Sequence, residues 1–558
     1  MIPKGYVDEY IEYFKKYGKE DLNKFKIKLS SKYNLKKLPT DIELFLSTEE
    51  NLPELIVTKP TRTISGVAVV ALMTMPFKCP HGKCIYCPGG MESEFGDVPQ
   101  SYTGHEPSTM RGLRNNYDAY LQVMNRLEQY IVIGQNPEKV ELIIMGGTFP
   151  SFPLTYQELF VQDAFKAMND FSNLFYKNNE LDLVKFKEFF ELPGDKNDNE
   201  RASRIKNKLL ELKNKDKLSL EKLHELNEIS MIKCVGLTIE TKPDYGFLKH
   251  GNDMLRLGCT RVELGVQTVY ADVIEKLNRG HTLDETKRSI AELRDIGFKL
   301  NFHIMPGLPL VDQKRDEKAF KILFNDTSFK PDMIKIYPTL VFRDTPLFKL
   351  YEKGEYKPLN EDDASTLIAK AMQYIPKYCR VMRVQRDIPS KFAVAGPLKN
   401  NLRQYIDKEI KRLNIDVNEI RSREIGMKKN LIDIKPEIDV YEYEASGGKE
   451  FFISFNDINS NSIIGFCRLR FPNLILRDEF DNQTAIIREL HVYGTATSLG
   501  KEGKVQHKGF GSRLMNKAEE IAKNNGKNKL LVISGVGVRG YYRKLGYNNE
   551  GPYMSKKL

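Results

Sequence analysis

The 558-residue sequence contains no tryptophan, seven cysteines and no apolar run near the ~18 residues that cross a bilayer. The lack of such a run excludes a helical membrane protein, and the opening stretch MIPKGYVDEYIEYFKKYGKE lacks the apolar core of a secretory signal. We therefore expect a soluble, cytoplasmic protein. In that reducing compartment, an odd number of mostly scattered cysteines argues against a disulfide framework and favours metal or redox use of any tight cluster.

Charge of neither sign is scarce, because 86 Lys and Arg residues stand against 75 Asp and Glu, a net charge of +11. This excess favours a polyanionic partner only slightly, since many basic proteins bind no nucleic acid. Hydrophobic residues make up 41% of the chain, which is a globular balance. The chain is too long for one core, so we expect at least two domains.

The order of helical and strand-like patterns divides the first part of the chain. Helical periodicity with many lysines predicts a small basic helical unit over residues 1–60. Between 61 and 375, helical patterns alternate with strand-like runs, which begin with VAVVALM and continue at 139–149, 234–244, 261–269, 299–309 and 332–341. This alternation predicts an α/β fold with a parallel sheet, and in barrel-like versions the site lies at the carboxyl ends of the strands. A Lys/Glu/Leu-rich stretch near 151–232 predicts a helical insertion.

After residue 375 the pattern changes. The arginine-containing run RVMRVQRDIPS predicts a basic linker over 376–405. Antiparallel-looking strands follow, then a glycine turn that opens a helix, a further strand and a last helix. This order predicts a compact α+β domain over 406–558.

Three of the seven cysteines lie within nine positions of the stretch KCPHGKCIYCPGG, at Cys79, Cys84 and Cys87. A loop rich in glycine and proline can bend around a metal without strain. A zinc site would need a fourth ligand, for which His81 is the nearest candidate, and purely structural cysteines would be dispersed and buried. Three thiolates suit a four-iron cluster whose fourth iron stays open for a substrate or cofactor. We favour the iron–sulfur interpretation.

Two further motifs follow strand-like runs. The stretch MGGTF contains Gly146 and Gly147, where backbone groups can approach a cofactor, although a strand-ending turn is the ordinary alternative. The stretch IETKPD carries Glu240, Lys242 and Asp244 at another strand end, where polar groups would point at the same rim. Taken singly, such residues are more often surface salt-bridge formers.

The C-terminal part contains a glycine turn just before a helix. Backbone N–H groups and the positive end of a helix bind a pyrophosphate, which QHKGFG at 506–511 would allow. A glycine loop alone is weak support for such a site. Tyr541 and Tyr542 in GYYRKLGY are by themselves typical of an aromatic pair in a core.

Basic residues cluster in the N-terminal unit and in the segments TKPTRT and CRVMRVQRDIPSKF. A solvated helix face is the usual meaning of a lysine run. Alternating arginines on an extended segment between two domains could instead line a cleft with groups that pair with phosphate. The candidates for RNA contact are Lys59, Arg62, Arg380, Arg383, Arg386 and Lys391.

These motifs resemble known enzymes. Three cysteines after the first strand of a βα repeat are similar to the signature of radical S-adenosylmethionine (SAM) enzymes, and CPHGKCIYCPGG with QSYTGHEPSTMRGLRNNYDAYLQ resembles the family of Elongator catalytic subunits. The resemblance covers nearly the whole chain and includes MGGTFPSFP, GCTRVELGVQTVY, RVQRDIPS and VISGVGVRGYYRKLGY. It implies a radical SAM partial (β/α) TIM-like barrel followed by an α+β acetyltransferase domain of the GNAT type. One departure is the gap of four residues between Cys79 and Cys84, where common radical SAM enzymes have three.

The resemblance also implies roles for individual residues. Cys79, Cys84 and Cys87 would hold a [4Fe-4S] cluster whose free iron chelates SAM, with the glycines of MGGTF at the methionyl end of that cofactor. Lys139 would contact acetyl-CoA from the radical domain. The expected acetyl-CoA contacts of the GNAT domain are Glu489, Leu490, His491, Val492, Gln506, Gly509, Phe510, Gly511 and Tyr541. The expected catalytic residues are Glu240, Lys242, Tyr541 and Tyr542.

For function, the resemblance implies a tRNA-modifying acyltransferase. A 5′-deoxyadenosyl radical would abstract hydrogen from the methyl of acetyl-CoA, and the carbon radical would add to C5 of the wobble uridine, giving 5-carboxymethyluridine after thioester hydrolysis. A tRNA anticodon stem-loop presents such a base more readily than a duplex does. A protein lysine acetyltransferase with a structural iron–sulfur cluster and an RNA-binding scaffold with a vestigial acetyl-CoA site stay open as alternatives. A homodimer and accessory subunits also stay open.

Overall fold

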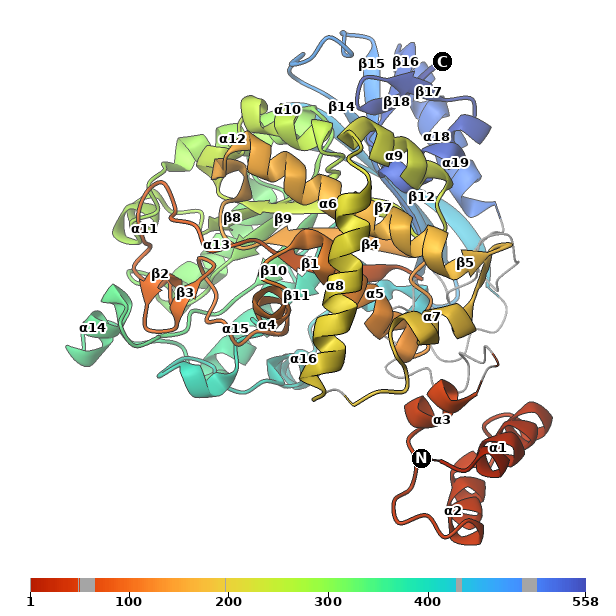
Figure 1. Cartoon of the computed structure of the whole chain (residues 1–558). Coiled ribbons are helices and arrows are strands. Elements are labelled where there is room, and N and C mark those ends of the chain that lie inside the picture. Colours follow the sequence, from red (N-terminus) through yellow and green to blue (C-terminus); the bar gives the residue numbers. More distant parts are fainter. Residues whose placement is uncertain (1, 49, 51–65, 196, 428–433, 494–508) are drawn as a thin grey trace.

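The computed structural model describes residues 2–48, 50, 66–195, 197–427, 434–493 and 509–558. These residues form two seven-stranded sheets with helices packed on them, and a separate group of N-terminal helices (Figure 1). The first sheet is parallel and the second is mostly antiparallel. The expected fold class, a partial (β/α) barrel followed by an α+β domain, is confirmed.

Seven parallel strands form the first sheet in the order β1-β4-β7-β8-β9-β10-β11. Each strand joins the sheet beside its predecessor, so the crossover helices lie on one face and the sheet curls. The carboxyl ends of all seven strands therefore lie at one end of the sheet. The bounds are β1 Ala68–Met73, β4 Lys139–Met145, β7 Lys233–Thr241, β8 Arg261–Gln267, β9 Lys299–Ile304, β10 Met333–Ile336 and β11 Arg380–Arg383.

Side chains of each strand alternate between the covering helices and the concave face of the sheet. On β4, Val140, Leu142 and Ile144 are buried under the helices, while Lys139 and Glu141 are half-buried on the opposite face. The concave face thus receives the polar residues of the strands. The main helices on the outer face are α5 Ala119–Val132, α10 Leu248–Arg256, α12 Leu283–Asp295, α13 Gln313–Asn325 and α15 Glu361–Met372.

Short elements gather around the carboxyl ends of the strands. They comprise β2 Gly90–Ser93, β3 Gly96–Val98, α11 Ala271–Lys276 and α14 Pro346–Glu352, at the left of Figure 1, and α4 Pro107–Arg114, nearer its centre. The cysteine-containing segment runs from β1 to the β2–β3 hairpin within this group. Loops at this end of a parallel sheet are the usual place for an active site.

Four helices and a small hairpin separate β4 from β7. Within the expected insertion, α6 buries a long apolar face, whereas α8 has one buried residue, Leu209. Figure 1 shows α8 crossing the outside of the molecule, as expected for a charged helix. The bounds are α6 Leu154–Phe175, β5 Tyr176–Lys177, β6 Glu180–Leu181, α7 Leu183–Phe189, α8 Asn199–Lys215 and α9 Leu220–Ile229.

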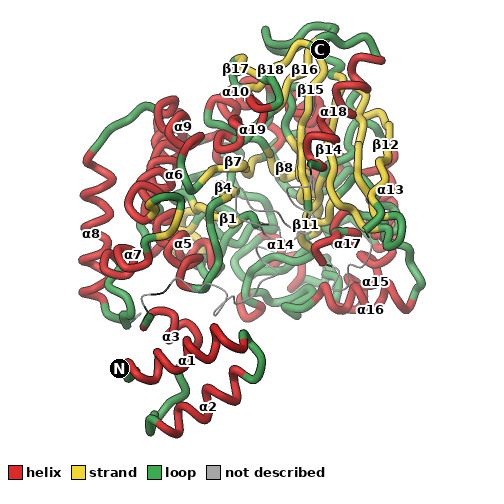
Figure 2. The backbone as a smooth tube through the Cα atoms, turned by 90° about the vertical axis from the view of Figure 1, so that its right-hand side faces the viewer, coloured by secondary structure: helices red, strands yellow, loops and turns green. Residues whose placement is uncertain are grey.

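The N-terminal helices are α1 Lys4–Tyr17, α2 Leu22–Lys32 and α3 Asp41–Ser47. Tyr6 holds α1 and α2 together, because its buried hydroxyl donates to the Lys26 carbonyl (3.1 Å). In Figures 1 and 2 this group stands to one side of the two sheets. It contacts the insertion where Lys187 of α7 donates to the Phe45 carbonyl (3.0 Å).

The interpretation of 376–405 as a linker is wrong. Arg380–Arg383 form β11, which pairs with β10 and completes the first sheet. The helix α16 (Leu402–Arg412), which the sequence pattern assigned largely to the C-terminal domain, packs on α15 instead. A four-residue strand with arginine at both ends carries little apolar signal, so its place comes from backbone pairing with β10.

The second sheet has the order β12-β13-β14-β15-β16-β18-β17. Its strands pair antiparallel except β15 with β16, and α18 (Phe510–Asn524) covers β13, β14 and β15. The short helices α17 (Ile420–Arg423) and α19 (Arg539–Lys544) complete the domain. The strand bounds are β12 Pro436–Ala445, β13 Gly448–Asp457, β14 Ser462–Phe471, β15 Thr484–Val492, β16 Lys529–Val532, β17 Asn548–Glu550 and β18 Tyr553–Lys557.

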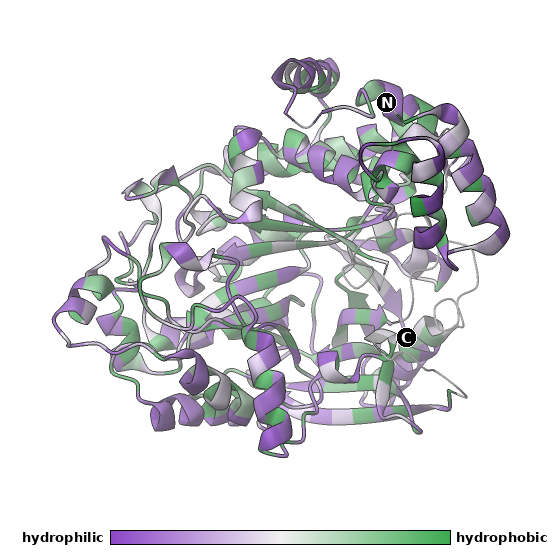
Figure 3. Cartoon of the chain, turned by 90° about the horizontal axis from the view of Figure 1, so that it is seen from below, coloured by the Kyte–Doolittle hydropathy of each residue, from purple (hydrophilic) through white to green (hydrophobic). Residues whose placement is uncertain are grey.

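Hydrophobic residues concentrate on the strands, while the outer helices alternate hydrophobic and hydrophilic residues (Figure 3). This distribution is that of sheets buried between layers. Among the described helices, none combines the length and the apolar character needed to span a membrane.

Candidate active site

The cysteine loop passes over the carboxyl end of the first sheet. A tight turn brings two of its cysteines together, because the Cys87 N–H donates to the Cys84 carbonyl (3.0 Å). The loop is fixed to the end of α11, where the Ile85 N–H donates to the Leu277 carbonyl (3.2 Å). Cys84 and Cys87 are buried and Cys79 is half-buried. The loop is therefore a packed part of the molecule with its thiols turned inward.

The three thiols lie close enough together to affect one another's ionisation. The pKa of Cys79 is raised to about 11, chiefly by burial and further by the charges of Cys87 and Cys84. Burial and Cys84 likewise raise the pKa of Cys87. Thiols that oppose one another's ionisation suit a positively charged metal group, which binds all three as thiolates. The donor set therefore fits an iron–sulfur cluster with three protein ligands.

Polar hydrogens point at these thiols from the surrounding chain. Gln100 Nε2 donates to Cys87 Sγ (3.3 Å), and Arg279 Nη1 donates to Cys84 Sγ (3.5 Å). The buried Arg279 side chain also donates to the Tyr86 hydroxyl (3.1 Å). A guanidinium at this position offsets the negative charge of a thiolate-bound cluster. Our sequence-based site did not include Arg279, which lies in the stretch NRGHT at residues 278–282.

Gly146 and Gly147 lie next to the cysteine loop, at the carboxyl end of β4. Both have a positive φ (126° and 109°), and a Cβ on Gly146 would lie 2.2 Å from Thr74 Oγ1. Only glycine fits this bend. Thr148, the next residue, has its hydroxyl 3.8 Å from Cys79 Sγ. The glycine turn and the thiols thus border the same space, as the sequence predicted.

Charged side chains from four neighbouring strands meet on the concave face. They are Glu240 on β7, Glu263 on β8, His303 on β9 and Lys335 on β10. His303 Nε2 lies 2.9 Å from Glu263, and Lys335 pairs with Glu263 and, at 3.7 Å, with Glu240. Tyr102 donates to Glu240 (3.1 Å) from the segment that follows the cysteine loop. Although burial opposes ionisation, Lys335 and His303 hold the pKa of Glu263 well below its usual value.

This polar cluster, Glu240, Glu263, His303 and Lys335, has ligand atoms at metal-site spacing. Those of the first three lie within 4.8 Å of one another. The Lys335 ammonium contacts both carboxylates and Arg261 lies 3.8 Å from Glu263, so two cations balance the two carboxylates without a metal. The cluster offers preorganised donors and acceptors to a polar ligand on the concave face. Sequence reasoning found Glu240 only, and the missed signal was a polar residue at every second position of apolar strands.

Lys242 points to a different place from Glu240. Its ammonium lies 2.8 Å from His81 Nδ1 in the cysteine loop and 3.2 Å from Asp244. Burial lowers the pKa of Lys242, while Asp244 raises it. Lys242 therefore contacts the cysteine loop, whereas Glu240 belongs to the polar cluster. Glu240 and Lys242, which the sequence analysis grouped as catalytic, therefore contact different residues.

In the second sheet, β15 opens away from β16 at the segment assigned to acetyl-CoA. The strands pair up to Ile487, whose carbonyl accepts the last contact from the Ile533 N–H (3.1 Å). Residues 489–492 pair with β14 and, among the described strands, have no partner on the β16 side. Free N–H and C=O groups on a strand edge suit the amides of pantetheine. Beyond β16 the chain turns to the first sheet, where a Cβ on Gly535 would lie 2.2 Å from the Val235 carbonyl.

The helix α18 begins at the glycine turn expected to bind pyrophosphate. Gly509 caps this helix in the left-handed conformation (φ 77°). A Cβ on Gly511 would lie 2.7 Å from the Tyr541 hydroxyl, so Tyr541 reaches the first turn of α18. Tyr542, by contrast, is 6% exposed and packs in the core. Gln506 lies outside the described residues.

The side chains of the assigned acetyl-CoA residues are mostly occupied elsewhere. Glu489 accepts a hydrogen bond from Arg468 (2.8 Å), and the Phe510 ring packs 5.2 Å from Phe455. These positions would serve a cofactor through their backbone groups. The remaining side chains of the strand segment are half-buried, at Leu490, His491 and Val492.

Lys139 lies at the other end of β4 from the glycine turn. It pairs with Lys233 at the start of β7, and the seven residues of β4 span about 20 Å. Burial lowers the pKa of Lys139. Lys139 is thus at the amino end of the sheet, the end on which the C-terminal domain packs. Its contact with acetyl-CoA remains a prediction.

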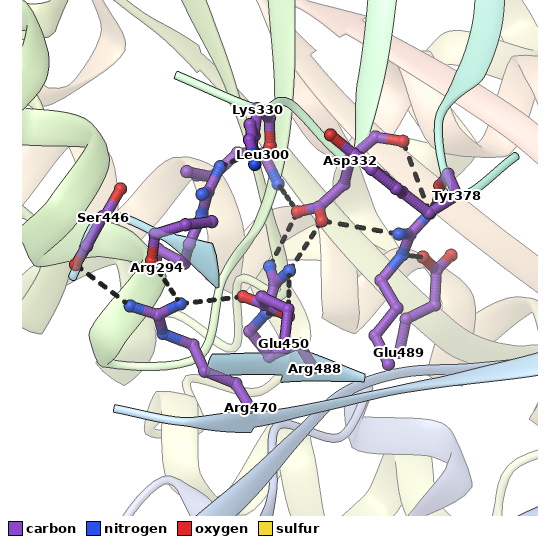
Figure 4. Close-up of polar contacts among 12 residues, drawn as sticks. Arg294, Leu300, Lys330, Asp332, Tyr378, Ser446, Glu450, Arg470, Arg488 and Glu489 are labelled. Atoms are coloured by element: carbon purple, nitrogen blue, oxygen red, sulfur yellow. Dashed lines mark hydrogen bonds and ion pairs between the residues drawn. The ribbon is translucent and has the colours of Figure 1, made fainter. Parts of the chain in front are cut away.

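A buried network of arginines and carboxylates joins the two domains (Figure 4). Asp332, just before β10, accepts from Arg488 (2.6 and 2.7 Å) and lies 3.5 Å from Arg468. Arg470 contacts Asp295 at the end of α12. These side chains are at most 1% exposed. Because an unpaired charge here would be costly, the network fixes the orientation of the second sheet on the first.

Half of the six basic residues assigned to tRNA do not form a described surface. Arg380 donates to Glu424 (2.9 Å) and to the Tyr493 hydroxyl (2.8 Å), so it belongs to the domain junction. Its assignment to RNA is therefore withdrawn. Lys59 and Arg62 lie outside the described residues.

The other three basic residues end or follow β11, at the carboxyl end of the first sheet. Arg386 donates to the Ser101 carbonyl, and the Ser101 hydroxyl is 3.7 Å from Cys87 Sγ. The side chain of Arg383 is 47% exposed, and Lys391 is also exposed. The Lys391 ammonium lies 4.9 Å from the centre of the Phe392 ring. Phe392 packs with two further partly exposed rings, with centroids 4.1 to 6.4 Å apart, at Phe95 and His105.

Three family models match the chain and follow its two sheets. The Radical SAM superfamily matches residues 73–321 and the Radical_SAM C-terminal domain matches residues 331–412. The Acetyltransferase (GNAT) family matches residues 418–547. The second match includes β11 and α16, which the structure also places with the first sheet.

Similar proteins cover the chain almost from end to end. The tRNA uridine(34) acetyltransferase of Methanocaldococcus jannaschii is 45% identical over 509 residues, 90% of this chain and 86% of that protein. Elongator complex protein 3 of Homo sapiens is 39% identical over 97% of this chain and 94% of its own. The solved structure of Methanocaldococcus infernus Elp3 with an N-terminal deletion has a TM-score of 0.72 at 38% identity, over 89% of this chain and 100% of that one. This chain is therefore a member of the Elongator complex protein 3 family, with a radical SAM domain and a GNAT domain.

Proposed function

We propose that this protein attaches an acetyl-CoA-derived carboxymethyl group to C5 of the wobble uridine of tRNA. One observation carries the proposal: the chain presents three converging thiols at one end of a parallel sheet and an opened GNAT strand in the domain packed on its other end. Its families imply a [4Fe-4S] cluster with SAM and acetyl-CoA. Relatives named for uridine 34 of tRNA support the substrate.

When bound, the cluster and SAM supply a carbon-centred radical that removes hydrogen from an unactivated C–H bond. C5 of a neutral pyrimidine is a poor site for polar acylation, so a radical route suits the product. Cys79, Cys84 and Cys87 would hold the cluster, and the glycine turn after β4 leaves room for the methionyl end of SAM. Burial of these groups keeps water away from the reacting atoms.

The polar cluster on the concave face would orient the reacting ligands. On the concave face, Glu240 offers a hydrogen-bond acceptor and Lys335 offers a donor. The Glu263–His303 pair can hold a proton at His303 Nε2. Among the proposed catalytic residues, we retain Glu240 for this role. We also retain Tyr541, whose hydroxyl lies at the start of α18. Tyr542 packs in the core and Lys242 contacts the cysteine loop, so we give both a supporting role.

The surface beside the cysteine loop fits an unpaired RNA loop. Arg383, Arg386 and Lys391 offer cations to phosphates, and the adjacent rings of His105 and Phe392 offer faces on which a base can stack. Anticodon loops combine both features. We propose tRNA as the partner and the cytoplasm as the place of action. We also propose accessory subunits, as the name Elongator complex protein 3 indicates for relatives.

The alternative of a protein lysine acetyltransferase with a structural cluster has less support. A structural cluster does not need the glycine turn against Thr74 or the polar cluster behind it. An RNA-binding scaffold would not need the opened β15 edge or the Gly509 cap at the start of α18. The tRNA-modifying function alone uses both halves of the chain.

The test is anaerobic reconstitution of the full chain with iron and sulfide, followed by incubation with SAM, acetyl-CoA, tRNA and dithionite as the one-electron reductant of the cluster. We expect 5′-deoxyadenosine from SAM and, when acetyl-CoA and tRNA are also present, 5-carboxymethyluridine, both detected by mass spectrometry. Cys84→Ala should abolish both products. The matched control is Cys259→Ala, because Cys259 is buried (1% exposed) at the amino end of β8. Full uridine modification by Cys84→Ala would exclude the radical route.

A further inference from the structure

The four-residue gap between Cys79 and Cys84 contains a histidine that points at a thiol. His81 Nε2 lies 3.3 Å from Cys84 Sγ. Its ring also closes on Gly280, where a Cβ would lie 2.3 Å from the His81 Cβ. The His81 side chain therefore lies between Cys84 of the same loop and Gly280. The loop between Cys79 and Cys84 thus brings an imidazole to the cluster site.

The partner of the other ring nitrogen fixes the direction of the contact with the thiol. His81 Nδ1 lies 2.8 Å from the Lys242 ammonium, which can only donate. Nδ1 is therefore the acceptor and carries no proton, so the imidazole is neutral with its proton on Nε2. That N–H points at Cys84 Sγ. Lys242 is itself oriented by Asp244 (3.2 Å).

A continuous chain thus runs from the end of β7 to a cluster ligand. It consists of Asp244, Lys242, His81 and Cys84, joined at 3.2, 2.8 and 3.3 Å. Arg279 Nη1 donates to the same sulfur at 3.5 Å. Among the three loop thiols in the described structure, Cys84 receives both a guanidinium and an imidazole contact. Hydrogen bonds to the sulfurs are one of the means by which proteins set the potential of iron–sulfur clusters.

We propose that His81 is a positioning residue that raises the reduction potential of the cluster by donating its Nε2–H to the Cys84 thiolate, with Lys242 holding the required tautomer. A donor to a ligating sulfur withdraws negative charge and favours the reduced, more negative cluster. Gly280 leaves the space for this side chain, because a Cβ there would lie 2.3 Å from the His81 Cβ. The inference rests on the cluster site of the proposed function and is independent of the RNA substrate.

The test compares His81→Asn with His81→Gln. The amide nitrogen of Gln reaches the place of Nε2, whereas that of Asn ends near Nδ1, so only Gln retains a donor to the sulfur. Iron content and the visible spectrum first establish cluster loading, and a parent protein without a cluster would refute the proposed function itself. The midpoint potential is then measured by redox titration followed by electron paramagnetic resonance. His105→Asn is the matched control, since that exposed ring stacks on Phe392.

We expect His81→Asn to lower the ratio of reduced to oxidised cluster at a fixed potential about tenfold, a shift of about 59 mV for one electron. His81→Gln and His105→Asn should remain near the parent. Lys242→Met should shift the potential in the same direction, and the double variant should shift less than the sum. If His81→Asn does not hold iron, the midpoint potential of Lys242→Met tests the proposal in its place. An unchanged potential in a loaded variant, or strictly additive shifts, would overturn the proposal.

Discussion

The domain junction predicts a large loss of stability from one substitution, Asp332→Ala. Asp332 is fully buried and faces Arg488 at 2.6 Å and Arg468 at 3.5 Å, and it accepts from the Leu300 N–H (2.9 Å). Removing the carboxylate leaves two arginines without their shared counter-charge. Breaking a buried ion pair on one side costs about 3–5 kcal/mol. This is a substantial part of the roughly 5–15 kcal/mol that holds a typical domain folded.

Urea unfolding followed by circular dichroism at pH 7 measures this loss. Asp332→Asn keeps the volume of the side chain but removes its charge. If the lost charge is the cause, Asp332→Asn should lose most of the stability that Asp332→Ala loses. The matched control is Asp407→Ala on α16, where Asp407 is 50% exposed and pairs with Arg403 at 2.9 Å. An exposed i,i+4 pair contributes about 0.3–0.5 kcal/mol. A loss from Asp332→Ala no larger than that of the control would refute the reasoning.

The parent protein and Asp332→Ala also allow a test of how stability depends on pH. Although burial opposes ionisation, Arg488 and Arg468 hold the pKa of Asp332 below its usual value in the folded protein. A carboxyl with a lowered pKa stabilises the fold above its unfolded pKa of about 3.9, and this contribution falls as pH drops toward the folded pKa. The stability difference between the parent and Asp332→Ala should therefore be constant from about pH 5 to 7 and shrink below about pH 4.

Two further outcomes test the site. Gly146→Ala should sharply lower the iron bound after reconstitution, since a Cβ there would lie 2.2 Å from a threonine hydroxyl at a φ of 126°; Gly18→Ala, whose Cβ would meet nothing within 4 Å, is the control and should retain its iron. Arg383→Ala combined with Arg386→Ala should weaken tRNA binding and reduce the slope of log affinity against log salt by about one for each lost phosphate contact. Arg403→Ala on α16 should leave that slope unchanged, and filter binding at several salt concentrations distinguishes the cases.

The alternation of strands and helices was readable in the sequence because each strand of the first sheet is buried under helices and carries an apolar run. β11 was the exception. Its four residues, RVMR, contain two arginines, and only pairing with β10 makes them a strand. Such a segment has no local signal strong enough to distinguish it from a linker.

The candidate site was predictable where its residues are adjacent in sequence. The cysteines and the glycine turn of MGGTF could be recognised because each motif lies in one loop. The contact between His81 and Lys242 joins positions 161 residues apart, so no spacing rule reveals it. Glu263 and His303 are single polar residues in different strands, and their meeting depends on the parallel register of β8 and β9.

The strand β7 touches both halves of the proposed chemistry, since Gly535 of the GNAT domain packs on Val235 near its start and Lys242 follows its end. Its nine residues span about 30 Å at roughly 3.3 Å per residue. Inserting or deleting one residue would turn every later side chain to the opposite face and change the span as well. An insertion or deletion within β7 would therefore disturb the contact at Val235 or the one at Lys242, whereas a substitution on the outer face would disturb neither.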